Sequence, residues 1–224
     1  MNFRGRFEGE SLEILSSLTF QDCVEDLRRV LGSASYPPVL LAHGFGGLIT
    51  QRVAEEEKVS ALILISSLPS AEIGTGMSRA LRLMRLKYSP LIFFRRPFRL
   101  EEKDFCRIWL APMPEGQRAE ILKHMVSESG HLAREFFSPR VEVDSQRVRT
   151  PVLIVTGVED SVVPMKSFHE MAQRLRADLK VYSGHGHWII GESEGEKVVR
   201  DIHRWLVQRL GAEIPLAEFA EEQH

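Results

Sequence analysis

The chain has 224 residues, 43% of them hydrophobic, and its 29 basic and 31 acidic residues give a formal net charge of −2. These values exclude global disorder and leave no basic excess for binding nucleic acid. They predict a single domain over residues 1–224 that carries one insertion.

Signals for the membrane or for export are missing from the sequence pattern. No apolar run approaches the roughly 20 residues that cross a bilayer, and the first ten residues lack the apolar core of a signal peptide. The two cysteines, Cys23 and Cys106, form no disulfide framework. We therefore expect a cytoplasmic protein without a membrane span.

The first half of the chain contains one βαβ pattern. After an amphipathic helix over residues 22–31, the short apolar run 39–43 predicts a buried strand. The glycine-rich turn 44–47 then leads into a helical pattern that runs to about Lys58, and residues 61–65 predict a second strand. Strand, helix and strand at this spacing indicate a parallel sheet.

The second half repeats this order. Residues 152–155 and 179–182 predict two further strands, with a helix from Pro164 to about Arg176 between them. A final amphipathic helix follows, in which apolar residues recur three and four apart. The residues expected to be buried on this helix are Val198, Val199, Ile202, Trp205, Leu206 and Leu210.

Residues 70–147 separate the two halves and contain no convincing strand. Their helical patterns, interrupted by prolines, predict a helical insertion above the sheet. Nine basic residues lie between Arg79 and Arg107, and they indicate either a solvated face or an entrance that attracts substrates with a carboxylate. Phe93 and Phe94 are expected to line the core or a pocket.

Three turns follow predicted parallel strands and carry Gly44, Asp160 and His187 in that order. Ligands in open α/β sheets bind at this carboxyl edge. The stretch PVLLAHGFGGLITQR resembles the nucleophile elbow of the α/β-hydrolases, a strand-turn-helix that normally reads Gly-x-Ser-x-Gly. TPVLIVTGVEDSVVP resembles the acid-bearing strand and turn of that family, and SGHGHWIIGE resembles its histidine loop.

The resemblance implies an α/β fold, with a parallel sheet flanked by helices and a helical cap at residues 70–147. It implies a hydrolase of small ester or amide substrates that needs no metal or other cofactor. In such a site His187 is the base, Asp160 orients it, and the backbone N–H of Phe45 donates to an oxyanion.

Two departures from the family pattern change this expectation. Gly44 occupies the nucleophile position, so the site lacks a nucleophilic side chain, and we expect impaired catalysis, as in a pseudoenzyme. Glycine does suit the positive φ of an elbow. The strands that the family places before the elbow strand are also missing, so the sheet is expected to be shortened on its N-terminal side. Residues 39–43 would then form an exposed edge that favours self-association.

Several alternatives remain open at this stage. The His187–Asp160 dyad could act as a general base without a covalent nucleophile, or the chain could be a non-enzymatic binding protein for a small ligand or a partner. The turn 44–47 could bind phosphate, and His185 with His187 could bind a metal, although both patterns are incomplete. His43 is expected to have a structural role.

Overall fold

The fold is given by a computed structural model that describes residue 4 and residues 12–73, 77–137 and 141–211. Its elements in chain order are α1 (Leu12–Ser17), α2 (Phe20–Leu31), β1 (Val39–His43), α3 (Phe45–Val53), β2 (Ala61–Ile65), a 3₁₀ turn (Ala71–Ile73), α4 (Arg79–Phe93), α5 (Glu102–Trp109), α6 (Glu115–Lys123), α7 (Gly130–Phe136), β3 (Val152–Gly157), α8 (Met165–Leu175), β4 (Asp178–Tyr182) and α9 (Gly195–Leu210).

The four strands form one parallel sheet in the order β1-β2-β3-β4. The strands predicted at residues 39–43 and 61–65 have these bounds in the structure. All carboxyl ends therefore meet at the same edge of the sheet, which carries the turns singled out by their sequence.

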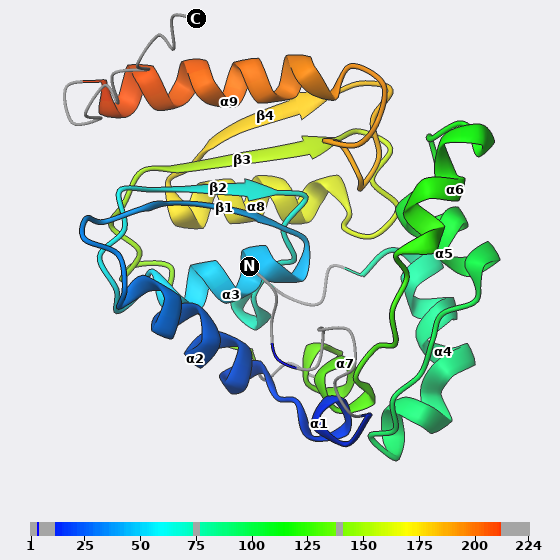
Figure 1. Cartoon of the computed structure of the whole chain (residues 1–224). Coiled ribbons are helices and arrows are strands. Elements are labelled where there is room, and N and C mark those ends of the chain that lie inside the picture. Colours follow the sequence, from blue (N-terminus) through cyan, green and yellow to red (C-terminus); the bar gives the residue numbers. More distant parts are fainter. Residues whose placement is uncertain (1–3, 5–11, 74–76, 138–140, 212–224) are drawn as a thin grey trace, which may run out of the picture.

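The two faces of the sheet pack against different helices. Alternate residues of β2 and β3 point to opposite faces, as strand geometry requires. On one face Ile63, Ile65 and Leu153 pack with α9. On the other face Leu62, Leu64 and Ile154 join the largest core cluster, which includes residues of α3 and α8. Figure 1 shows the result, with α9 on one side of the sheet and α3 and α8 on the other.

Helices fill the chain between β2 and β3. The described residues of this segment form α4 to α7 and a 3₁₀ turn, and their one β-type contact is an isolated bridge between Phe98 and Glu128. This segment lies to one side of the sheet, beyond the carboxyl ends of the strands (Figure 1). No helix in the described ranges is long and apolar enough to cross a membrane.

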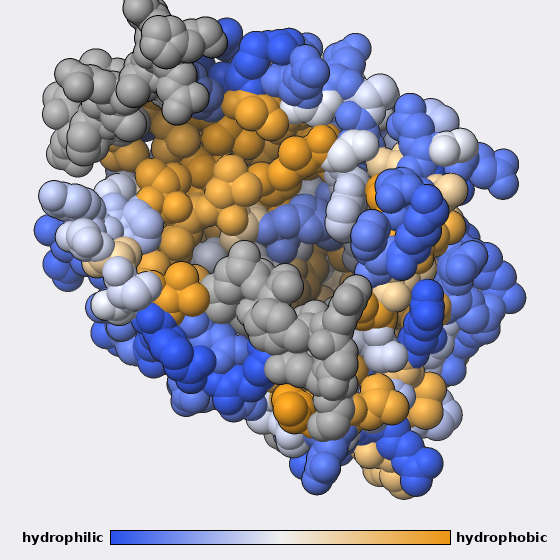
Figure 2. Space-filling view, viewed as in Figure 1, coloured by the Kyte–Doolittle hydropathy of each residue, from blue (hydrophilic) through white to orange (hydrophobic). Residues whose placement is uncertain are grey.

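Strand β1 is the edge of the sheet. Within the described residues it pairs with β2 alone. The register places Leu41 beside Ile63, on the face that α9 covers elsewhere, yet Leu41 is 56% exposed. A large hydrophobic area lies over this part of the sheet in Figure 2. The edge expected from the sequence is therefore confirmed.

Three local expectations are wrong. Helix α3 ends at Val53, before Lys58, because the chain turns there and Val59 then packs into the core. Val199 is exposed, since it lies beside the buried stripe of α9 and not within it. Phe93 and Phe94 are also exposed, so neither lies in the core.

Candidate active site

The turn after β1 has the geometry of a strained elbow. Gly44 adopts φ 55° and ψ −119°, a conformation that costs a residue with a Cβ about 1–3 kcal/mol. Its N–H donates to the carbonyl of Ile65, and its own carbonyl accepts the N–H groups of Gly47 and Leu68. These bonds fix the turn between β2 and the first turn of α3.

The start of α3 approaches the end of β2 closely. A Cβ on Gly47 would stand 2.2 Å from the hydroxyl oxygen of Ser67, so only glycine fits there. The Gln51 amide donates to the same hydroxyl, which in turn donates to the Leu68 carbonyl. Ser67 is therefore part of the scaffold, and no histidine contacts it in the described structure.

His187 and Asp160 form a buried pair. The Nδ1 atom of His187 lies 3.0 and 3.1 Å from the two carboxylate oxygens of Asp160. Both side chains are almost completely buried. Asp160 also accepts the N–H groups of Val162 and Val163, which hold the carboxylate in place before α8. Because a carboxylate only accepts, Nδ1–H of His187 donates, and Nε2 is left with its lone pair in the neutral ring.

The free nitrogen of His187 faces the elbow. A Cβ built on Gly44 would lie 3.3 Å from Nε2 of His187. The structure thus places His187 against Asp160 and beside the Gly44 turn. A hydroxyl on residue 44 would be within hydrogen-bond reach of Nε2.

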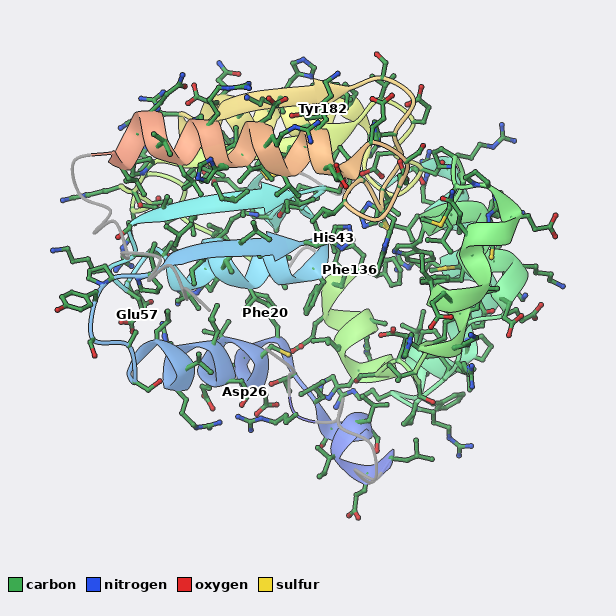
Figure 3. The ribbon with its side chains drawn as sticks, turned by 45° about the horizontal axis from the view of Figure 1, so that its top comes forward. Phe20, Asp26, His43, Glu57, Phe136 and Tyr182 are labelled. Atoms are coloured by element: carbon green, nitrogen blue, oxygen red, sulfur yellow. The ribbon has the colours of Figure 1, made fainter. Side chains whose placement is uncertain are left out.

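His43 supports the histidine loop from the neighbouring strand. Its Nε2–H donates to the backbone carbonyl of His187 over 2.9 Å, and its ring contacts the rings of His187 and Trp188 edge-on. Burial, followed by the proximity of His187, lowers the pKa of His43 to about 4. The ring is therefore neutral near pH 7 and has the structural role expected of it. Figure 3 shows His43 at the end of β1, on the side where Phe136 lies.

A second histidine–carboxylate pair was not found from the sequence. Nδ1 of His185 lies 3.1 Å from Glu192, and the same carboxylate accepts the N–H of Gly186 over 2.9 Å. Glu192 thus closes the loop that carries His187. It lies in an irregular turn, where no periodicity pointed to it.

An apolar cavity of about 250 Å³ opens next to His187. Phe45 lies in its wall, and α4, α5 and α7 supply half of the other lining residues. The remaining lining residues are Leu68, Leu81, Met84, Phe98, Leu100, Phe105, Trp109, Glu128, Ser129, Leu132, Ala133, Phe136, Phe137 and Val162. The cavity lies slightly below the range of about 300–1,000 Å³ that holds drug-sized ligands, so it fits a small apolar group.

Phe45 is the first residue of α3. The first N–H groups of a helix have no partner within the helix, and they lie at its positive end. The backbone of Phe45 therefore brings a donor to the same corner as His187. No group of three or more histidine, cysteine or acidic side chains in the described structure could hold a metal ion.

Comparison with known proteins bears on this arrangement. A family model described as "Alpha/beta hydrolase family" matches residues 1–201. The chain belongs to this family. Within it, a monoacylglycerol lipase of Mycolicibacterium smegmatis is 23% identical over 220 residues, which cover 92% of this chain and 75% of that protein.

Solved structures of α/β-hydrolases have the same fold. The monoacylglycerol lipase of Paleococcus ferrophilus matches with a TM-score of 0.67 at 20% identity, over 86% of this chain and 76% of that chain. An esterase of Exiguobacterium antarcticum matches with a TM-score of 0.67 at 18% identity, over 92% and 79% of the two chains. The expected fold class, a parallel sheet flanked by helices, is thereby confirmed.

Proposed function

We propose that this α/β-hydrolase family member binds small ester or amide substrates and hydrolyses them slowly, because Gly44 leaves its nucleophile position empty. The observation that carries the proposal is the position of Nε2 of His187, 3.3 Å from the site of a Cβ on residue 44, with Asp160 on the other ring nitrogen. The relatives named above are lipases and esterases, which supports the substrate class.

His187 would act as a general base toward water. A water molecule beside Gly44 would donate to Nε2 and attack the substrate carbonyl directly, without a covalent acyl-enzyme. Asp160 would stabilise the imidazolium that forms, and the N–H of Phe45 would donate to the oxyanion. Loss of a serine nucleophile costs about 10⁶ in kcat, so only slow turnover remains.

The apolar cavity indicates which part of a substrate would be buried. Its walls are mostly aliphatic and aromatic, and His187 is one of the few polar residues among them. A short acyl chain would lie in the cavity with its carbonyl at His187 and Phe45. We propose that residues 70–147 act as the cap over this site, since α4, α5 and α7 supply cavity walls.

Hydrolysis of a short-chain p-nitrophenyl ester tests this function. We expect slow hydrolysis by the wild-type chain, with a rate that falls to background in His187→Ala. His124→Ala is the matched control, because His124 is exposed. Equal rates in His187→Ala and the wild type would contradict the proposed base.

A second candidate is binding without turnover. It is favoured by the combination of a formed apolar cavity with a glycine at the nucleophile position. In this case a short-chain fatty acid or ester would bind in the cavity with the same affinity in His187→Ala and the wild type. A bulky substitution in the cavity wall, Ala133→Trp, should abolish binding in either case.

We further propose that β1 pairs with β1 of a second copy. The free side of β1 pairs with no other described strand and carries an exposed Leu41, and a two-fold axis would make this surface self-complementary. Sedimentation at micromolar concentration should detect dimers that Leu41→Lys dissociates. A stable wild-type monomer whose amides in β1 exchange freely would contradict this pairing.

We also propose a cytoplasmic location. The sequence contains two cysteines, and Cys106 is a partly buried free thiol. A reducing compartment keeps such thiols intact.

A further inference from the structure

Helix α4 carries apolar side chains on two opposite faces. Its inner face is buried and consists of Leu81, Met84, Tyr88 and Ile92. Its outer face is open to solvent and consists of Leu83, Leu86, Phe93 and the following Phe94, which we call the outer stripe. Leu86 is 70% and Phe94 is 68% exposed. Packing against the core explains why the inner face is apolar, but it does not explain why the outer stripe is apolar.

The same segment is strongly basic. Residues 79–100 contain seven arginine or lysine residues and no acidic residue. Five of the seven are exposed side chains without an ion pair to any described residue. These five are Arg79, Arg82, Arg95, Arg96 and Arg99. In Figure 2 hydrophobic and hydrophilic residues lie next to one another where Figure 1 places the lower end of α4.

The two remaining cations of the segment, Lys87 and Arg85, contact other residues of the chain. Lys87 contacts both Glu101 and Asp104, and Arg85 lies over the ring of Phe137. Acidic partners are therefore available to this segment, yet the five arginines do not pair with them. These arginines flank the outer stripe, and none of them has an ion-pair partner among the described residues.

The end of α4 holds aromatic rings and cations together. Phe93 and Phe94 stack edge to face with centroids 5.2 Å apart. Arg95 takes a left-handed conformation that turns the chain, and the N–H of Arg96 donates to the carbonyl of Leu91. Arg134 of α7 adds a further cation over the ring of Phe93.

We propose that the outer stripe and its arginines dock on an anionic lipid surface. Leucine and phenylalanine side chains enter the boundary between headgroups and acyl chains, while arginines bind the phosphates. The seven cations of residues 79–100, without an acidic residue among them, surround exposed leucine and phenylalanine side chains and complement the negative charge of such a surface. The inner face of the same helix lines the cavity, through Leu81 and Met84.

Co-sedimentation with vesicles tests the docking without measuring turnover, so its outcome is independent of the proposed function. We expect the full chain to bind phosphatidylcholine vesicles that contain phosphatidylglycerol, and added salt to weaken this binding. Vesicles of phosphatidylcholine alone should bind far less protein.

Double substitutions separate the contribution of the arginines from that of the apolar side chains. Each arginine at an anionic surface contributes a factor of about five, so Arg95→Gln/Arg96→Gln should weaken binding about 25-fold. Leu83→Ser/Leu86→Ser and Phe93→Ser/Phe94→Ser should each release the protein from the vesicles. Val199→Ser/Val207→Ser on α9 is the matched control, since both residues are exposed and apolar, and it should bind like the wild type.

Three results would overturn the proposal. One is the absence of binding to both kinds of vesicle. Another is an equal loss of binding in the α9 control, which would make the effect unspecific. The third is a dimer in vesicle-free solution that Phe93→Ser/Phe94→Ser dissociates, because the outer stripe would then be occupied by a second copy.

Discussion

Two histidines of one loop, His185 and His187, each pair with a carboxylate, and the two pairs have different surroundings. His185 pairs with Glu192, seven residues later, and the same carboxylate also accepts the N–H of Gly186, so this pair is closed within the loop. His187 pairs with Asp160, 27 residues earlier, at the end of another strand, and its second nitrogen faces Gly44. The same chemical pair therefore closes a loop in one case and, in the other, joins two loops and leaves a ring nitrogen facing the Gly44 turn.

The largest expected effect separates the two histidines by reactivity. In a Gly44→Ser background, His187→Ala should reduce ester hydrolysis by at least about a hundredfold, since a general base contributes about 10²–10⁴. His185→Ala should retain most of the reactivity once the folded fraction is matched by circular dichroism. Equal losses in the two variants would remove the distinction between the pairs.

The next largest effect concerns His43, which holds the backbone of His187. Its pKa is lowered to about 4 in the folded protein, while the unfolded chain takes up the proton near pH 6.5. The free energy of unfolding that depends on neutral His43 is therefore fully present above about pH 6.5. It is lost as the pH falls toward 4, and the total loss is up to about 3 kcal/mol.

Urea unfolding of the wild type and His43→Gln over this pH range measures the effect. The glutamine amide can replace the donor to His187 but does not titrate, so the variant should lose less stability on acidification. His124→Gln, at an exposed position, should follow the wild type. Parallel curves for the wild type and His43→Gln would mean that His43 does not titrate with folding.

A smaller effect tests the structural pair. Glu192→Ala leaves the buried N–H of Gly186 without its acceptor, which costs about 1–3 kcal/mol. Glu196→Ala is the control, because that side chain is 90% exposed. Thermal or urea unfolding should show a lower midpoint for Glu192→Ala alone. Equal midpoints for the two variants would show that Glu192 does not hold the loop.

Some features of the fold and of the site could be predicted from the sequence. Short apolar runs located β1 and β2 to the residue, but β1 is a partly exposed edge strand and not the buried strand that its sequence predicted. The motif order placed Gly44, Asp160 and His187 at the same edge of the sheet, since parallel strands end together. The contact between Asp160 and His187 followed from that topology.

Other features depend on tertiary contacts that no local pattern records. His185 and His187 looked like a possible metal pair, and only their separate carboxylates distinguish them. Glu192 gave no signal, because it lies in an irregular turn. Phe93 and Phe94 were expected inside, but apolar residues on both faces of α4 made the direction of burial ambiguous.

The most direct test of the central claim is phosphonate labelling of Gly44→Ser. A serine at φ 55° costs some stability, and its Cβ requires His187 to shift by a few tenths of an ångström, so folding is checked first by circular dichroism. A fluorophosphonate should then form an adduct that mass spectrometry assigns to residue 44, absent in the wild type and much reduced in Gly44→Ser/His187→Ala. A folded Gly44→Ser protein that takes up no label would contradict the claim that this corner is a nucleophile elbow missing only its side chain.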